Sequence, residues 1–271
     1  MKKIKYILKT LCLICLAFSI LLVSCDKTDV PNETTAESES DIQVGGTPEE
    51  TPGDEPKKRV AITFDDGPHN VRTREIVDEL DKYGFTATFF VVGNRVDGGA
   101  YNGGDTVKYI IEHGHEVGVH GYTHEVYYDE CTDEEYLYEI SMTAQAINSK
   151  VKDYNIRLMR PVGGYITNAR VQESEYSVIM WNVDSFDYKN AYFPDDERYT
   201  DEEKAAMVDA IVENVMSNVK DGAIILMHDI YLSTSHAVAI ILERLYNEGY
   251  EVVSVSELLG DPAPGVKYNG K

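Results

Sequence analysis

Short apolar runs alternate with helix-like patterns through most of the chain, beginning at Arg59. Seven runs have the length and composition of β-strands, at residues 59–64, 85–92, 115–119, 155–159, 177–183, 223–227 and 250–253. The stretch 71–83 repeats apolar residues at helical spacing, and Gly84 is placed to end that helix. Repeated strand–helix alternation predicts a parallel sheet or barrel.

Helix boundaries agree with this reading. Thr132 with Glu135, and Thr200 with Glu203, have the spacing of capping boxes that open helices. Glycines that would end helices stand just before three of the strands, at Gly114, Gly222 and Gly249. Strands this apolar are expected to be buried on both faces. Seven such units in about 200 residues favour an α/β barrel over an open sheet.

The first 58 residues have a different texture. Residues 1–24 place an early lysine cluster before an apolar run, which is typical of a signal peptide. Leu22-Val23-Ser24-Cys25 resembles the lipobox of bacterial lipoproteins, so we expect acylation of Cys25 and a location on the outer face of the cell membrane. An uncleaved anchor helix and an ordinary signal peptide are the alternatives. Residues 25–58 are predicted to form a disordered acidic tether that spans about 30 Å.

The chain is strongly acidic and poor in cysteine. Its formal net charge is −22, and loss of four lysines with the signal peptide makes the mature chain more negative still. This balance argues against a nucleic-acid partner, which needs a basic surface. Cys12 and Cys15 would leave with the signal peptide and Cys25 would carry lipid. Only Cys131 then remains, so we expect no disulfide within the mature chain.

Ionisable residues follow five of the predicted strands at their carboxyl ends. They are Asp65-Asp66, His120, Arg160, Asp184 and His228-Asp229. Active sites of parallel α/β barrels are built at that face. The sequence therefore predicts that these five strand ends converge on one site.

The spacing of His120 and His124 suits a transition metal. Together with a carboxylate from another strand they supply three ligands and leave one position open. Gly121 stands where the metalloprotease helix motif requires Glu, which disfavours a protease. A non-haem iron oxygenase uses the same donors, but on antiparallel barrels. A plain hydrogen-bonded histidine pair also remains open, as does a simple turn or helix cap at Asp65-Asp66.

Residues 59–260 as a whole resemble the polysaccharide deacetylases, carbohydrate esterase family 4. Five stretches carry the resemblance in the family's order, at 63–68, 120–124, 160–164, 184–188 and 226–229. The resemblance implies a distorted seven-stranded α/β barrel as a single catalytic domain, followed by a tail at 261–271. It also implies a hydrolase that acts on carbon–nitrogen bonds other than peptide bonds.

The resemblance assigns Asp66, His120 and His124 to one divalent metal ion. Zn²⁺ is the default for these ligands, and Co²⁺, Ni²⁺ and Mn²⁺ are alternatives.

Four further roles follow from the resemblance. Asp65 is expected to be the general base and His228 the general acid. Arg160 is expected to pair with Asp65, and Asp184 to hydrogen-bond His228. Structural ion pairs at the barrel rim are the alternative for Arg160 and Asp184.

Two positions depart from the family pattern. Gly163 stands where an aromatic residue is usual, with Tyr165 as a candidate replacement, and Tyr188 stands where Trp is common. Both changes concern the walls that would contact a sugar. The loops 93–104 and 185–200 are long, and they serve either binding or ordinary packing.

The sequence thus predicts a monomeric enzyme that removes N-acetyl groups from N-acetylglucosamine-containing polysaccharide. Peptidoglycan is the expected polymer because the anchor and tether would place the domain beside the wall. Chitin oligosaccharides and acetyl-xylan are the alternative substrates. A non-catalytic carbohydrate-binding surface protein is the alternative from another class.

Overall fold

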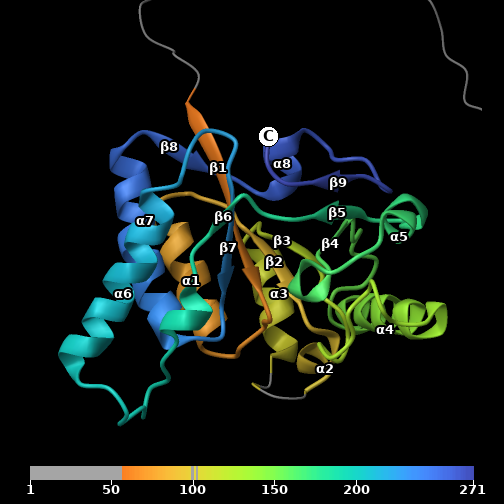
Figure 1. Ribbon diagram of the computed structural model, residues 1–271, viewed down its shortest axis with the longest axis horizontal. Helices are drawn as coiled ribbons and strands as arrows, with labels where there is room; N and C mark the ends of the chain where they lie inside the picture. The colour runs from red at the N-terminus through yellow and green to blue at the C-terminus, as the bar shows by residue number, and fades with distance from the viewer. Residues whose placement is uncertain (1–56, 99–100, 102) are drawn as a thin grey trace, which may run out of the picture. The chain divides into compact units, whose positions relative to one another are not determined.

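The computed structural model describes residues 57–98, 101 and 103–271. The strands in this part of the chain are β1 Lys58–Asp65, β2 Thr88–Val91, β3 Glu116–Val119, β4 Leu158–Met159, β5 Ser177–Ile179, β6 Val183–Asp184, β7 Ile224–His228, β8 Tyr250–Val252 and β9 Lys267–Tyr268. Every pairing between these strands is parallel, in the order β6-β7-β1-β2-β3-β4-β5-β9, with β8 also paired to β1. This sheet (Figure 1) confirms the predicted α/β fold of the barrel type.

One predicted strand, 177–183, is broken into β5 and β6, whereas each of the other six overlaps one strand, of which β4 is only two residues long. The guanidinium of Arg160 donates hydrogen bonds to the carbonyl oxygens of Ile179 and Met180, both at 3.0 Å. These carbonyl groups are therefore taken by a side chain at the point where the strand breaks. A further strand, β9, lies in the stretch expected to be a tail and pairs with β5.

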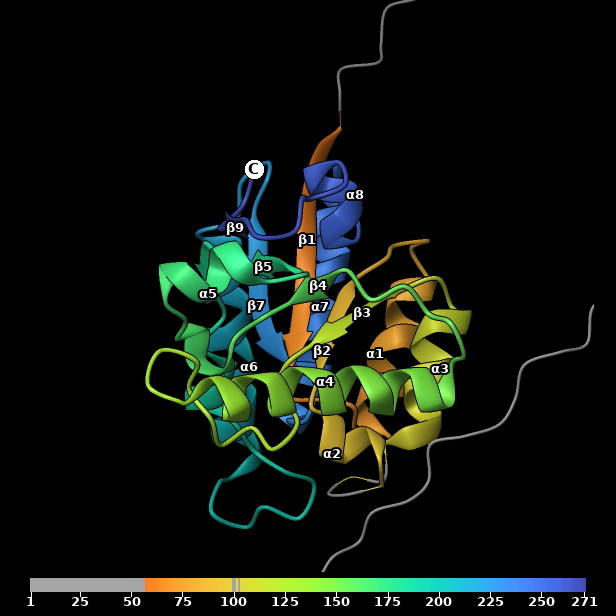
Figure 2. The same ribbon diagram turned by 90° about the vertical axis from the view of Figure 1, so that its right-hand side faces the viewer.

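Helices surround the sheet. They are α1 Arg72–Asp81, α2 Gly93–Val96, α3 Gly104–Glu112, α4 Asp133–Lys150, η2 Val162–Gly164, α5 Asn168–Glu173, η3 Asp187–Asn190, α6 Asp201–Met216, α7 Leu232–Asn247 and α8 Val255–Leu259. Neighbouring helices pack in the order α6, α7, α1, α3, α4 around the outside (Figure 1, Figure 2). Both predicted capping boxes are present, at the starts of α4 and α6.

The two long loops have different outcomes. The prediction of a loop over 93–104 is wrong in part, because α2 occupies 93–96 and α3 begins at Gly104; residues 99–100 and 102 lie outside the described part. In the loop 185–200 the structure records one short helix, η3.

Alternation along β1 explains how the sheet prepares a site. Val60, Ile62 and Phe64 belong to the main core against the helices, whereas Ala61 belongs to a smaller apolar cluster on the other face. Thr63 and Asp65 follow Ala61 at the two-residue spacing of a strand and lie on that second face. The strand is buried on both faces, as predicted, and its inner face becomes polar toward its carboxyl end.

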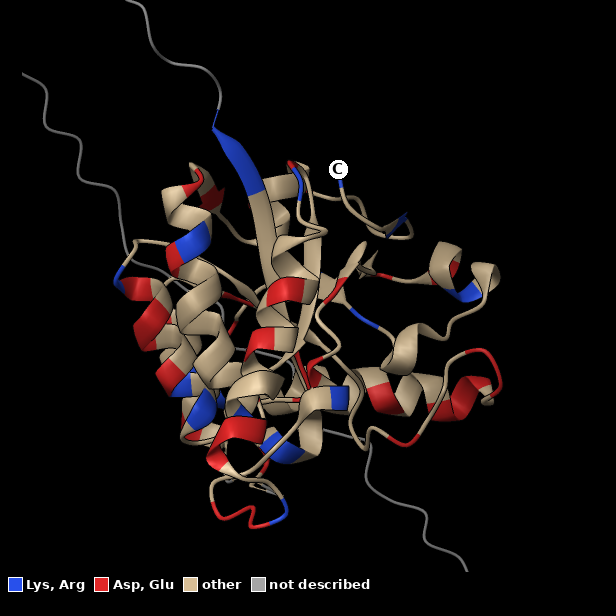
Figure 3. Cartoon of the chain, turned by 60° about the vertical axis from the view of Figure 1, so that its left-hand side comes forward, with Lys and Arg blue, Asp and Glu red and all other residues tan. Residues whose placement is uncertain are grey.

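The predicted signal peptide, the acylated Cys25 and most of the tether fall at 1–56, outside the described residues. β1 begins at Lys58, next to the boundary expected between tether and domain. No helix in the described part has both the length and the apolar character needed to cross a bilayer. Acidic residues are spread over the outer helices and loops (Figure 3).

Candidate active site and metal centre

Ionisable side chains from several strand ends meet in one cavity. Asp65 ends β1 and His228 ends β7, and the register of these neighbouring strands pairs the two residues. The cavity has a volume of about 280 Å³, and its lining includes Asp65, Asp66, His120, Asp184 and His228. Its other lining residues are His124, Tyr127, Val162, Gly163, Trp181, Tyr188 and Leu226. The predicted convergence of strand ends is confirmed.

Asp66, His120 and His124 lie together, as the sequence predicts. Oδ1 of Asp66 is 2.8 Å from Nε2 of His124 and 3.4 Å from Nε2 of His120. One ligand atom from each of the three side chains lies within 4.8 Å of the others. This cluster, Asp66-His120-His124, is the candidate metal centre.

The cluster fits a metal ion. Oδ1 of Asp66 is buried and, although both imidazoles lie near it, makes no hydrogen bond of regular geometry with the described residues. Burial opposes ionisation of Asp66, but the contacts with His120 and His124 outweigh it and hold the pKa of this carboxyl well below its usual value. Two imidazole nitrogens and one carboxylate oxygen beside a cavity are donors that suit Zn²⁺ or a related transition metal.

Buried hydrogen bonds fix the loop that carries the two histidines. Nδ1 of His120 lies 2.8 Å from the carbonyl oxygen of Arg160. Nδ1 therefore carries the proton, and Nε2 is free to bind a cation. Glu139 in α4 is 1% exposed, and its Oε2 accepts hydrogen bonds from the backbone N–H groups of Tyr122 at 2.6 Å and Thr123 at 2.9 Å.

The backbone is left-handed at two candidate ligands. Asp66 has φ 72° and His124 has φ 65°, a conformation that costs a non-glycine residue about 1–3 kcal/mol. Arg95 donates to the carbonyl oxygen of Asp66 on one side of the turn. On the other side Asp229 packs so tightly that a Cβ atom on Gly67 would lie 2.3 Å from its carboxylate. The surrounding fold thus keeps the turn in place.

Arg160 and Asp65 form the predicted pair. Nη1 of Arg160 lies 2.8 Å from Oδ1 of Asp65 and 2.7 Å from Oγ1 of Thr63. The other carboxylate oxygen of Asp65 lies 3.7 Å from Nε2 of His120, so it faces the candidate metal centre. Arg160 is 0% exposed. The pair is therefore part of the interior and not an ion pair at an exposed rim.

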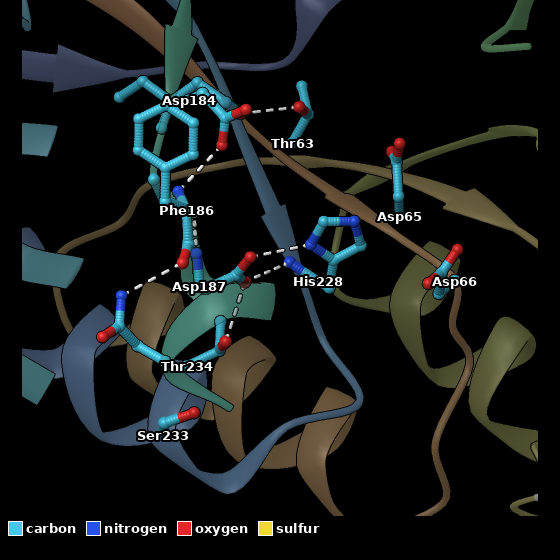
Figure 4. A network of polar contacts seen from close by, with 12 residues as sticks. Thr63, Asp65, Asp66, Asp184, Phe186, Asp187, His228, Ser233 and Thr234 are labelled. Atoms are coloured by element: carbon cyan, nitrogen blue, oxygen red, sulfur yellow. Dashed lines mark hydrogen bonds and ion pairs between the residues drawn. The ribbon is translucent and has the colours of Figure 1, made fainter. Parts of the chain in front are cut away.

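The predicted pairing of His228 with Asp184 is wrong, because Asp187 is the partner (Figure 4). Nδ1 of His228 lies 2.7 Å from Oδ1 of Asp187, and the backbone N–H of His228 donates to Oδ2 at 2.6 Å. Asp184 accepts instead from the backbone N–H of Phe186 at 2.8 Å. Phe186 is left-handed, with φ 52°, and the chain then turns into η3, which brings Asp187 under the imidazole.

Asp187 determines the charge state of His228. Burial opposes the charged imidazole, but the carboxylates of Asp187, Asp66 and Asp65 outweigh burial and raise the pKa of His228 to about 10. Asp187 is itself fully buried and also accepts a hydrogen bond from Oγ1 of Thr234 at 2.8 Å. His228 is thus held as an imidazolium whose Nε2 is not used by Asp187.

Aromatic side chains stand beside these polar groups. The ring of Tyr188 is 45% exposed and lies 6.0 Å from the imidazole of His228, and the ring of Tyr231 lies at the same distance. Tyr192, which lies in the loop 185–200 with Tyr188, is buried in the core. In this loop Tyr192 therefore serves packing, whereas Tyr188 lines the cavity, as a binding residue would.

Glu139 and the contact of Asp187 with His228 were not predicted from the sequence. Glu139 could have been found, because it is a single acidic residue among the buried positions of α4, with Ile140, Thr143 and Ile147. Asp187 had no such signal. It lies in the same short motif as Asp184, and the turn between them decides which one meets the histidine.

The chain resembles known proteins along most of its described length. The sequence model of the family described as polysaccharide deacetylase matches residues 52–177. A peptidoglycan-N-acetylmuramic acid deacetylase of Bacillus subtilis, PdaC, is 35% identical over 216 residues, which are 80% of this chain and 42% of PdaC. A peptidoglycan-N-acetylglucosamine deacetylase of Bacillus cereus is 35% identical over 218 residues, 78% of this chain and 91% of that protein.

Solved structures agree with the sequence comparisons. The structure of PdaC superposes with a TM-score of 0.65 at 33% identity, covering 77% of this chain and 93% of that one. A family 4 acetyl xylan esterase of Clostridium thermocellum, in complex with a cobalt ion, has a TM-score of 0.65 at 28% identity, covering 79% and 98%. This chain spans less than half the length of PdaC but nearly all of the Bacillus cereus protein.

Proposed function

Because the chain belongs to the polysaccharide deacetylase family, we propose that it is a metal-dependent hydrolase that removes N-acetyl groups from N-acetylglucosamine-containing polysaccharide. One observation carries this proposal. The Asp66-His120-His124 cluster, the Asp65–Arg160 pair and the His228–Asp187 pair surround a single cavity. That cavity offers a cation site, a base and an acid to one small group, such as an acetamide.

Asp66, His120 and His124 would hold a divalent ion, which when bound would supply Lewis acidity toward a carbonyl and toward water. Asp65 accepts the proton of the attacking water, since Arg160 fixes one of its oxygens and the other faces the candidate metal centre.

Charge and proton transfer at the substrate involve two other groups. The backbone N–H of Gly163, on the cavity lining, donates to the acetyl oxygen as negative charge develops there. His228, kept protonated by Asp187, gives its proton to the departing sugar nitrogen. Without that proton an amine is a very poor leaving group.

Peptidoglycan is the proposed polymer. The named activities of the Bacillus relatives support a wall substrate, on N-acetylglucosamine in one case and N-acetylmuramic acid in the other. The sequence of residues 1–24 and Cys25 supports a lipid-anchored location outside the membrane, from which the tether would reach the wall. Loss of fatty-acid labelling in a Cys25→Ser variant would test the anchor.

The test is acetate release, with and without a chelator. We expect the zinc-loaded protein to release acetate from peptidoglycan faster than from chitin oligosaccharides or acetyl-xylan, and a chelator to stop the reaction. Asp65→Asn should abolish turnover while zinc still binds, and His120→Ala should lose both. Turnover near the wild-type rate in Asp65→Asn would refute the base assignment, and chelator-resistant release would refute the metal dependence.

A further inference from the structure

Gly163 provides the space for an aromatic ring at the edge of the cavity. Its backbone has φ 62°, and a Cβ atom added there would lie 2.8 Å and 2.9 Å from two ring carbons of Tyr165. A Cβ atom on the next residue, Gly164, would lie 2.9 Å from the methyl carbon of Met180 and 3.1 Å from the ring of Trp181. The two glycines thus let the rings of Tyr165 and Trp181 rest directly against the backbone of this loop.

Tyr165 is paired with Tyr127 from the loop that follows His124. Their ring centroids are 5.1 Å apart, edge to face, and the rings are 53% and 49% exposed. Both loops are anchored. The backbone N–H of Tyr128, a fully buried residue, donates to the carbonyl oxygen of Tyr165, and Arg170 donates to the carbonyl oxygen of Tyr128 at 2.6 Å. The backbone that carries the two exposed rings is therefore held in place.

We propose that Tyr127 and Tyr165 form a stacking wall for the sugar unit next to the acetylated one in the same glycan chain. The wall is continuous with the reaction cavity, since Tyr127 and Gly163 line that cavity. This proposal rests on the proposed function and names the residues that select a polymer over a single sugar.

The chemistry of the wall favours a sugar over other ligands. Phenol rings offer flat apolar faces to the C–H groups of a pyranose and hydroxyl groups to its edge.

The test uses the zinc-loaded protein and a chitin tetrasaccharide. Tyr165→Ala and Tyr127→Ala should each raise KM by roughly three- to tenfold with kcat nearly unchanged. Tyr165→Phe, which keeps the ring, should retain most of the wild-type KM. Tyr246→Ala removes a tyrosine that is 58% exposed in α7 and serves as the control for loss of a surface ring.

The result that overturns the wall is an unchanged KM in both alanine variants, or a fall in kcat with KM unchanged. Binding of the tetrasaccharide to the Asp65→Asn protein, by calorimetry, separates the two proposals because it requires no turnover. Weaker binding in Asp65→Asn/Tyr165→Ala supports the wall even if the wild-type protein releases no acetate, in which case the proposed function alone fails. Equal binding in both proteins refutes the wall.

A double-mutant cycle tests the role of Gly163. Gly163→Ala places a Cβ atom where the ring of Tyr165 lies, so it should displace the ring and raise KM in the wild-type background. In the Tyr165→Ala background the same substitution meets no ring and brings only the backbone strain of a left-handed alanine, so it should raise KM by a smaller factor. Fully additive effects on KM would show that the ring does not lie against Gly163.

Discussion

Replacement of Glu139 should weaken metal binding although its recorded hydrogen bonds go to other residues than the three candidate ligands. Its carboxylate accepts two backbone N–H groups, of Tyr122 and Thr123, and the hydroxyl of Thr123 at 2.8 Å. Those residues lie between His120 and His124, so Glu139 sets the shape of the segment that spaces the two imidazoles. It is buried, which keeps water from replacing it.

The magnitude follows from the hydrogen bonds. A bond to a charged acceptor contributes about 1.5–3 kcal/mol and a neutral one about 0.5–1.5 kcal/mol. Glu139→Gln keeps the shape of the side chain but removes the negative charge from the acceptor of two N–H groups. It should therefore lower the free energy of unfolding by about 2 kcal/mol. Glu139→Ala leaves both N–H groups unpaired and should lower the free energy of unfolding by about 3 kcal/mol. The affinity for Zn²⁺ should fall roughly tenfold.

The assay is zinc affinity by chelator competition, with urea unfolding of the metal-free protein beside it. Glu134→Gln is the matched control, because Glu134 is an exposed acid in the first turn of the same helix. We expect the control to bind zinc like the wild-type protein. If Glu139→Ala is folded and its zinc affinity is unchanged, the loop does not depend on this carboxylate and the reasoning is wrong.

Three other predictions follow. Asp187→Asn should move the basic limb of the pH profile of kcat/KM to lower pH, because Asp187 helps to raise the pKa of His228 to about 10. A basic limb at the wild-type pH would show that His228 is not the general acid. Arg160→Met should lower the free energy of unfolding in urea by about 3–5 kcal/mol, because it leaves the buried Asp65 without its partner. A decrease of less than about 1 kcal/mol would contradict this prediction. Burial lowers the pKa of His115 to about 4, so between pH 6.5 and 4 the unfolded chain takes up a proton that the folded chain does not. Stability should therefore fall by about 2 kcal/mol from pH 7 to pH 5, and His115→Asn should flatten that fall in urea midpoints measured at both pH values.

The sequence predicted those features that depend on order along the chain. Buried parallel strands show as apolar runs, and each run ends where its first polar residue begins, so Asp65, His120 and His228 could be assigned to one face. The capping boxes were equally local, since each needs two residues of one turn. For both, the pattern and the structure involve the same few neighbouring residues.

Other features depend on contacts between distant segments. The break in 177–183 occurs where Arg160, from another strand end, takes the carbonyl groups of Ile179 and Met180. β9 is two residues long and joins the sheet through backbone hydrogen bonds with β5, which leave no mark on composition. His228 meets Asp187 and not Asp184 because Phe186 adopts a left-handed backbone conformation, which the sequence around Phe186 does not indicate.

At this site the same side chain both stabilises the fold and orients a reacting group. Arg160 binds the carbonyl groups at the strand break with two of its donors and orients Asp65 with a third, so no substitution of Arg160 separates folding from turnover. Asp65 differs, because an asparagine side chain has the shape of aspartate and can still accept a hydrogen bond from Arg160. The hydrogen bond from Arg160 to Thr63 is unaffected by that change. A base can therefore be removed here while the frame that positions it stays intact. Asp65→Asn is therefore a sharper test of the chemistry than a change at Arg160, provided that urea unfolding of the variant is measured beside its turnover, because the buried Arg160 loses its counter-charge.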